Sequence, residues 1–331
     1  MDPEQKTRIK NGKINYLRLS VTDRCNLRCI YCMPEEGVDF LPHKEILRYE
    51  EMFRIIQIAM DCGIRKVRLT GGEPLARKGF IPFVKELSHL SGLEEITLTT
   101  NGVLLKASAA SLKEAGIHRI NISLDSLDPG VFARITGKDQ YHQVWEGIEE
   151  AERLGFDPIK INVVVMKGFN DGEILDFARL TLRKPYHVRF IEFMPVGKQN
   201  GWTVDRFIPL KEIQAQIGAL GTLYPVASNP LDGPAARFRL AGSQGELGFI
   251  GAVSQHFCHN CNRLRLTADG HLKGCLFSRE ELDIKTPLRN GNGPDTLREM
   301  IHQVIENKPQ GYQLMKSGPR KCVRPMSAIG G

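Results

Sequence analysis

The chain has 331 residues, enough for one large domain and a smaller one, and its 41% hydrophobic and 25% charged residues are typical of a globular protein rather than a disordered one. The charged N-terminal sequence MDPEQKTRIK and the lack of an apolar run after it exclude a signal peptide and a membrane span, so we expect a cytoplasmic protein without a membrane partner. The net charge of +7 suggests an anionic partner, but there is no Lys/Arg run of the nucleic-acid-binding type, so we expect no nucleic acid.

Up to about Pro195, short β-branched runs alternate with longer helical patterns. Six strands are predicted over 16–23, 66–72, 94–102, 118–126, 159–166 and 186–195. Helices are predicted between them, for example over 50–63, 81–90 and 104–116. Successive βα units of this kind predict a parallel sheet with helices on one or both faces.

One face of each of the first five strands is polar, although parallel strands are usually apolar on both faces. In the first strand, Arg18, Ser20 and Thr22 alternate with apolar residues. The polar faces of the next four strands carry Arg68 and Thr70; Thr97, Thr99 and Asn101; Asn121, Ser123 and Asp125; and Lys160 and Asn162.

An open doubly wound sheet would have to bury these polar faces under helices, which is energetically costly. A partial (βα)6 TIM-type barrel avoids that cost because its inner face lines a wet cavity. We therefore predict this α/β fold. The side chains of Arg18, Arg68 and Lys160 in such a lumen suit a phosphate-bearing substrate.

The pattern changes after about Gly197. A helix is predicted within 200–218 and a turn-rich linker over 228–235. Short strands are predicted over 236–242, 247–254 and 263–267, before a final helix over 296–308. We therefore divide the chain into a partial-barrel domain over residues 1–228 and a smaller α+β domain over 229–331 that closes the lumen.

Eight cysteines in a protein expected in a reducing compartment point to metal binding rather than to disulfides. Cys25, Cys29 and Cys32, the first cysteine group, form C-x3-C-x2-C after the first predicted strand, at the strand end where βα folds place their active sites. Three thiolates suit a [4Fe–4S] cluster with one iron left open. A structural zinc site would need a fourth ligand, for which His43 is a candidate.

Cys258, Cys261 and Cys275, the second cysteine group, form C-x2-C-x13-C and by themselves resemble a zinc knuckle. We assign Cys62 and Cys322 to neither group. In the zinc interpretation, the candidates for the fourth ligand are His256, His259 and His271.

The first cysteine group resembles the signature of radical S-adenosylmethionine enzymes, which have an aromatic residue, here Tyr31, before the third cysteine. The sequence TGGEP over 70–74 is similar to the segment with which that superfamily binds the methionine end of S-adenosylmethionine. Gly71 and Gly72 let the backbone approach a ligand closely. The sequence CNRLRLT over 261–267 and the chain end RPMSAIGG further resemble the GTP 3′,8-cyclase family of molybdenum cofactor (molybdopterin) biosynthesis, over essentially the whole chain.

This resemblance implies a lyase with two [4Fe–4S] clusters, one on each cysteine group, and with S-adenosylmethionine as cofactor. The first cluster would cleave S-adenosylmethionine to methionine and a 5′-deoxyadenosyl radical, which takes hydrogen from C3′ of GTP so that C3′ attacks C8 of guanine. The product would be (8S)-3′,8-cyclo-7,8-dihydroguanosine 5′-triphosphate, which a cyclic pyranopterin monophosphate synthase converts further. The second cluster would bind the guanine through its open iron, and an external electron donor is implied.

The resemblance also implies roles for single residues. Contacts to S-adenosylmethionine are expected from Tyr31, Gly72, Ser123 and Met194. Contacts to GTP are expected from Arg18, Arg68, Thr99, Lys160, Arg263 and Arg265, and from the terminal Gly330 and Gly331. Five of these side chains lie on the polar faces that the strands predict without the resemblance, namely Arg18, Arg68, Thr99, Ser123 and Lys160.

Two other functions agree with parts of the sequence. A radical S-adenosylmethionine maturase that modifies peptides would also carry an auxiliary cluster, but such enzymes tend to have more C-terminal cysteines, and only Cys322 is left over here. A zinc-binding nucleic-acid module is suggested by the positive charge and the second cysteine group alone. The sequence leaves open whether the protein is a monomer or a homodimer.

Overall fold

Six βα units build the first part of the chain, as predicted. The computed structural model describes residues 14–34, 37–197, 201–309 and 324–330. The six strands are β1 (Tyr16–Ser20), β2 (Lys66–Thr70), β3 (Glu95–Thr100), β4 (Arg119–Ser123), β5 (Ile159–Val165) and β6 (His187–Glu192). The helices among them are α1 (Tyr49–Asp61), α2 (Phe80–Ser88), α3 (Leu105–Glu114), α4 (Pro129–Thr136), α5 (Tyr141–Arg153) and α6 (Ile174–Arg183).

The rest of the described chain adds strands at both ends of this sheet. Its strands are β7 (Leu223–Pro225), β8 (Ala236–Leu240), β9 (Glu246–Ile250), β10 (Arg263–Leu266), β11 (His271–Lys273) and β12 (Leu282–Asp283). Its helices are α7 (Leu210–Ile217), α8 (Lys285–Arg289), α9 (Pro294–Glu306) and α11 (Met326–Ile329). None of the helices in the described part of the chain is long and apolar enough to cross a membrane.

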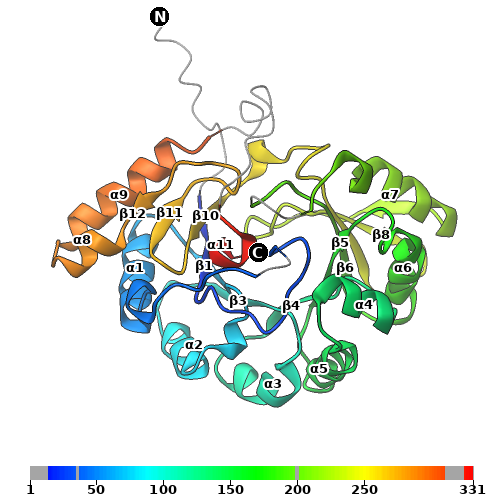
Figure 1. Cartoon of the computed structure of the whole chain (residues 1–331), viewed down its shortest axis with the longest axis horizontal. Helices are drawn as coiled ribbons and strands as arrows, with labels where there is room; N and C mark the ends of the chain where they lie inside the picture. Colours follow the sequence, from blue (N-terminus) through cyan, green and yellow to red (C-terminus); the bar gives the residue numbers. More distant parts are fainter. Residues whose placement is uncertain (1–13, 35–36, 198–200, 310–323, 331) are drawn as a thin grey trace, which may run out of the picture.

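The strand order is β12-β11-β10-β1-β2-β3-β4-β5-β6-β9-β8-β7. β9 is parallel to β6 and β10 is parallel to β1, whereas the outer strands join through antiparallel pairs. Because β12 and β7 end the order, the sheet does not close into a ring. Figure 1 shows α1 to α6 along the outer side of the arc, with α11 on its inner side. The predicted partial (βα)6 barrel is confirmed.

Residues 251–262, here called the closing segment, connect β9 to β10. These two strands flank the six βα strands on opposite sides, so the closing segment crosses from one end of the parallel strands to the other. In Figure 1 it is the yellow connection across the open side of the arc. The C-terminal part thus closes the lumen by bridging both edges of the barrel.

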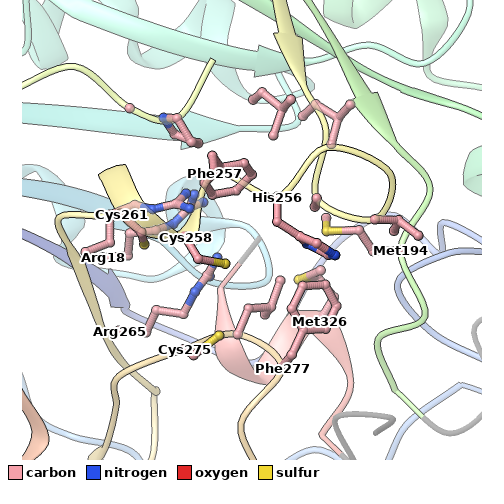
Figure 2. A pocket seen from close by; sticks show the side chains of 18 of the residues that line it. Arg18, Met194, His256, Phe257, Cys258, Cys261, Arg265, Cys275, Phe277 and Met326 are labelled. Atoms are coloured by element: carbon pink, nitrogen blue, oxygen red, sulfur yellow. The ribbon is translucent and has the colours of Figure 1, made fainter. Parts of the chain in front are cut away.

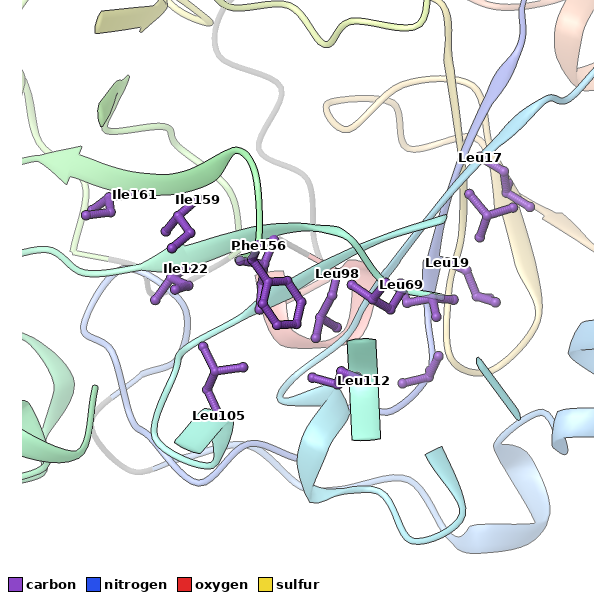
Figure 3. Packing of buried hydrophobic residues seen from close by; sticks show 14 of the residues in the cluster. Leu17, Leu19, Leu69, Leu98, Leu105, Leu112, Ile122, Phe156, Ile159 and Ile161 are labelled. Carbon is purple, nitrogen blue, oxygen red and sulfur yellow. The ribbon is translucent and has the colours of Figure 1, made fainter. Parts of the chain in front are cut away.

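The apolar faces of the strands point outward to the helices. Leu69, Leu98 and Ile122 are fully buried and share one cluster with Leu105 and Leu112 of α3 (Figure 3). Burial of each such side chain contributes about 1.5–3 kcal/mol to stability. The polar faces are therefore left on the concave side of the sheet.

The strand register places the polar residues of this inner face side by side. Arg18 of β1 lies between Arg265 of β10 and Arg68 of β2. Asn121 of β4 lies opposite Lys160 of β5. The polar and apolar positions thus have the phase that the sequence predicts.

The turn-rich stretch predicted as a linker packs across the amino ends of the strands. Lys66, at the start of β2, donates a hydrogen bond to the carbonyl of Leu231 at 2.9 Å. Asn15 and Asn262, which precede β1 and β10, each donate to the carbonyl of Pro230 at 3.3 Å. The stretch therefore forms a floor under the lumen.

Strands on both sides of the proposed 228/229 domain boundary belong to one sheet, and that boundary stays a prediction.

Candidate active site

The two cysteine groups lie at opposite ends of the parallel strands. The first group follows β1 at its carboxyl end. Cys258 and Cys261 precede β10, which is parallel to β1, and so lie toward the amino ends of the strands. Cys275 follows β11, which is antiparallel to β10, and joins them there. The lumen runs between the two groups.

A cavity in this lumen reaches the second cysteine group. Cys258, Cys261 and Cys275 line it together with Arg18 and Arg265 (Figure 2). Its wall also includes Arg68, Asn162, Arg189, Met194, His256 and Arg263.

The cavity brings together five of the residues predicted to bind cofactor or substrate, namely Arg18, Arg68, Met194, Arg263 and Arg265. The other predicted residues that the structure describes do not line the cavity. They are Tyr31, Gly72, Thr99, Ser123, Lys160 and Gly330. Arg189 was not predicted, although it alternates with Val188 and Phe190 in the sixth strand in the same way as the predicted arginines.

Burial and mutual repulsion perturb the cations of the lumen. Arg18 is 8% exposed, and burial followed by the charge of Arg265 holds its pKa well below the ordinary value. Burial, and then the charges of Arg189 and Arg68, lower the pKa of Lys160 to about 6. Cations that repel one another in a buried site favour the binding of an anion there.

Two of these arginines, Arg68 and Arg189, donate hydrogen bonds to neutral acceptors. Arg68 donates from Nε to Thr97 Oγ1 at 3.2 Å, and Arg189 donates from Nη1 to Asn121 Oδ1 at 3.2 Å. The hydroxyl of Thr99 is buried and has no hydrogen-bond partner among the described residues. The inner face thus offers positive charge and a hydrogen-bonding group that a polar ligand can use.

The loop of the first cysteine group is tied to α4. The backbone N–H of Arg28 donates to the carbonyl of Thr136 at 2.8 Å, and that of Ile30 donates to the carbonyl of Ile135 at 3.0 Å. These bonds fix the loop that carries the three sulfurs beside the carboxyl end of β1.

Burial raises the pKa of all three thiols of the first group. The pKa of Cys29 is raised further by Cys32 and Cys25, and that of Cys32 by Cys25, so the three sulfurs lie near one another. Thiolates that repel one another in a buried site require positively charged partners, which the irons of a cluster would supply. The first group therefore fits a [4Fe–4S] cluster.

The Gly71–Gly72 turn packs against the chain just before Cys25. The N–H of Gly72 donates to the carbonyl of Thr22 at 2.6 Å. A Cβ at Gly72 would lie 2.1 Å from the carbonyl oxygen of Arg24, so a larger residue cannot be accommodated without a shift of the backbone. The sequence predicts that the backbone at these glycines approaches a ligand closely. In this structure it closely approaches the backbone of residues 22–24, just before Cys25.

Two buried carboxylates near the first group are missing from the predicted site. Glu73 accepts hydrogen bonds from Thr100 Oγ1 and the N–H of Asn101, both at 2.7 Å, and burial raises its pKa to about 7. Asp125 accepts from the hydroxyl of Tyr31 at 2.6 Å, and burial raises its pKa to about 6. Their positions in TGGEP and on a polar face were visible in the sequence, but their full burial was not.

Cations surround Cys261 of the second group. Burial raises the pKa of this thiol, but Arg263 and Lys308 outweigh burial and lower the pKa to about 6. Lys308 is held by hydrogen bonds from its Nζ to the carbonyls of Arg263, at 2.6 Å, and Gly274. Its role was not predicted. The thiolate is the form that binds metal, so the lowered pKa favours the ligand form of Cys261 at neutral pH.

The zinc interpretation requires side chains that converge on a single ion. No three histidine, cysteine, aspartate or glutamate side chains within the described ranges converge closely enough to hold a single metal ion. His271 Nδ1 lies 3.1 Å from Asp269 Oδ2. A cubane takes one thiolate on each of three irons, and therefore tolerates a wider spacing of sulfurs than a single zinc ion does.

The end of the described chain enters the lumen. Arg265 donates from Nη1 to the carbonyl of Gly330 at 2.7 Å. Gly330 has a φ of +85°, and a Cβ there would lie 2.6 Å from Cγ2 of Thr70. Glycine is therefore required at this position. Gly331 and Cys322 lie outside the described residues.

Two families account for most of the chain. Residues 19–181 match the Radical SAM superfamily, and residues 186–314 match the family described as Molybdenum Cofactor Synthesis C. Among solved structures, Streptococcus suis SuiB bound to S-adenosylmethionine shares the fold, with a TM-score of 0.60 over 95% of this chain and 77% of that chain, at 14% sequence identity.

Curated relatives match over nearly their full lengths. The protein named GTP 3′,8-cyclase of Thermodesulfovibrio yellowstonii is 53% identical over 97% of this chain and 98% of its own. Proteins of the same name from Desulforamulus reducens and Geobacter sulfurreducens are 50% and 48% identical, over 97% and 96% of this chain and 98% and 97% of their own. The chain therefore belongs to the GTP 3′,8-cyclase family of radical S-adenosylmethionine enzymes.

Proposed function

We propose that the protein converts GTP to (8S)-3′,8-cyclo-7,8-dihydroguanosine 5′-triphosphate, the first step of molybdenum cofactor biosynthesis. The relatives named GTP 3′,8-cyclase support this reaction, since they match almost the entire chain. The structural observation that carries the proposal is the buried row of Arg265, Arg18 and Arg68 on the wall between the cysteine groups. Three adjacent guanidinium groups shielded from water suit a triphosphate.

Membership of the radical S-adenosylmethionine superfamily implies one [4Fe–4S] cluster and S-adenosylmethionine. When bound, they supply the 5′-deoxyadenosyl radical that takes the hydrogen from C3′ of GTP. The first cysteine group would hold this cluster. Tyr31, Gly72, Ser123 and Met194 would contact S-adenosylmethionine, and the hydrogen bond to Asp125 fixes the ring of Tyr31 for this task.

The triphosphate of GTP would bind Arg18, Arg68, Lys160 and Arg265. Its negative charge would relieve the mutual repulsion that lowers the pKa of Lys160. The buried hydroxyl of Thr99 would donate to GTP, since no described residue accepts from it. The chain's role here is to hold the nucleotide still and to exclude water from the radical.

A second [4Fe–4S] cluster would bind Cys258, Cys261 and Cys275. The cations that lower the pKa of Cys261 favour the ligand form, and the cavity reaches all three sulfurs. An open iron there would take the guanine base, with Arg263 beside it. The ribose would then lie nearer the first cysteine group, where hydrogen abstraction has to occur.

The remaining assignments follow from this function. Residues 1–228 would form the radical-generating domain and residues 229–331 the domain for the second cluster and the substrate, in a cytoplasmic enzyme. An external electron donor would reduce the first cluster, and cyclic pyranopterin monophosphate synthase would take the product. The peptide-maturase alternative rests only on the auxiliary cluster that such enzymes also carry, whereas the 53% identity to a protein named GTP 3′,8-cyclase supports the cyclase.

The reaction is tested by anaerobic incubation with S-adenosylmethionine, a reductant and GTP. We expect 5′-deoxyadenosine to form in the presence of GTP and to stay near background with ATP, since guanine recognition would be lost. Liquid chromatography with mass detection measures 5′-deoxyadenosine and the cyclised nucleotide together. Equal 5′-deoxyadenosine with both nucleotides, or none with either, would contradict the assignment.

The second cluster is tested by Cys258→Ala. We expect the iron content after anaerobic purification to fall from about eight to about four per chain, because one of two four-iron clusters is lost. Cys62→Ala is the matched control, since Cys62 lies in neither group, and its iron content should stay at about eight. Zinc in the unsubstituted protein, or equal iron in both variants, would rule the second cluster out.

The low pKa of Lys160 predicts that GTP binding takes up protons. Its pKa of about 6 leaves it mostly neutral in the free protein at about pH 7.5, whereas bound triphosphate favours the charged form. Affinity should therefore fall as pH rises above 6. Calorimetry in buffers of different ionisation enthalpy should show the uptake, and Lys160→Met should abolish it and weaken binding about tenfold or more. The exposed Lys106→Met is the control; uptake that persists in Lys160→Met would refute this role.

The terminal glycines are tested by deletion of Gly330 and Gly331. We expect cyclisation to be abolished, since Gly330 contacts Arg265 within the lumen. Iron content and the visible absorption of the clusters should stay unchanged. Full cyclisation by the shortened chain would show that the tail has no part in the reaction.

A further inference from the structure

Glu192 is a buried carboxylate to which the proposed function gives no role. It is the last residue of β6 and is 0% exposed. Its Oε1 accepts from the N–H of Leu210 at 2.8 Å, and its Oε2 accepts from the N–H groups of Val253 and Ser254 at 2.7 and 2.9 Å. The hydroxyl of Ser254 also donates to Oε1. Four donors thus converge on one side chain.

These donors belong to two elements that contact the carboxyl end of β6 through Glu192. Leu210 begins α7, and Val253 and Ser254 belong to the closing segment. The ladder between β6 and β9 runs as far as Ile191 and Ile250, so the closing segment leaves the sheet immediately afterwards. Just beyond the point where strand pairing ends, the carboxylate of Glu192 accepts hydrogen bonds from the backbone N–H groups of the closing segment.

The closing segment turns sharply at this place. A Cβ at Gly251 would lie 2.9 Å from Cβ of Gln255 and 3.0 Å from Cδ2 of Leu210, so the turn is packed both on itself and on α7. Directly after this turn come His256, Phe257 and Cys258, which line the cavity. In Figure 2 His256 and Cys258 both border the open space of the pocket. The conformation of the turn therefore sets where these side chains lie.

We propose that Glu192 is a positioning residue for the second half of the active site. It fixes the turn at 251–255 and, through it, the place of Cys258 relative to the arginine row. This inference rests on the proposed binding of a cluster and of guanine at the second cysteine group. Glu192 does not line the cavity, so it would act on the second cysteine group through the closing segment.

The consequence concerns recognition of GTP rather than generation of the radical. The first cysteine group is held by α4 and by the Gly71–Gly72 turn, whereas the hydrogen bonds that Glu192 accepts within the described residues come from α7 and the closing segment. A displaced closing segment would therefore move the second group against an unchanged first group. Binding of GTP should weaken while cleavage of S-adenosylmethionine remains possible.

The test is Glu192→Gln in the full-length protein with its clusters. The amide keeps the volume but turns one acceptor oxygen into a donor, so at least one of the four donors loses its partner. We expect the KM for GTP to rise about tenfold or more and the GTP-induced change in the electron paramagnetic resonance signal of the second cluster to shift or vanish. Ser254→Ala, which removes one donor, should change both in the same direction by a smaller factor.

Glu51→Gln is the matched control. Glu51 is also a buried carboxylate, 6% exposed, that accepts hydrogen bonds from Arg48 and Arg289, but it lies on α1 at the outer side of the sheet. Both glutamine variants should lower the melting temperature, and only Glu192→Gln should alter the GTP response. A fall in iron content of Glu192→Gln to about four, with S-adenosylmethionine cleavage retained, would also support the role.

The inference is overturned if Glu192→Gln keeps the KM for GTP and the resonance change of the unsubstituted protein, whatever its melting temperature. It is also overturned if Glu51→Gln alters both readouts equally, since the effect would then be general destabilisation. Failure of the proposed function would look different, because the unsubstituted protein itself would then show no response to GTP.

Discussion

Like charges held side by side in a lumen shielded from water are the constraint on which the rest of the structure depends. The register of β10, β1 and β2 makes neighbours of Arg265, Arg18 and Arg68, each less than a tenth exposed. Such an arrangement destabilises the protein without ligand, because desolvation and repulsion act together. The continuous apolar cluster between the sheet and α1 to α6 has to offset it. The outer face thus gives stability and the inner face gives affinity for an anion.

The two cysteine groups differ in electrostatic surroundings. In the first group, burial and the neighbouring sulfurs raise the pKa of Cys29 and Cys32, so metal has to displace the protons. In the second group, Arg263 and Lys308 lower the pKa of Cys261, so the thiolate already exists at neutral pH. Arg263, one of these two cations, also lines the cavity. In the proposed function, the second cluster and the substrate would therefore bind in the same positive electrostatic field.

The features of the fold and the site that depend on local periodicity could be predicted from the sequence. Short β-branched runs predicted the six strands, and alternation with period two predicted the polar inner face of the first five, including Arg18, Arg68 and Lys160. Cysteine spacing predicted both groups. The sequence did not predict the roles of Glu192 and Lys308 or the packing of the stretch near Leu231. Each of these makes at least one hydrogen bond to a residue 45 to 165 positions away, and the sequence pattern around it is ordinary. Such roles arise from how the closing segment and the floor fold back on the barrel.

The position of β9 and β10 has a consequence for how the protein is made. β1 and β6 are the outermost strands of the six βα units, and β10 and β9, which cover them, are synthesised only after residue 245. Until then the nascent barrel presents two unpaired strand edges, which are templates for association with other chains. A chain interrupted before β9 would keep both edges open permanently. The C-terminal part therefore protects the newly made protein from aggregation, independently of anything it contributes to chemistry.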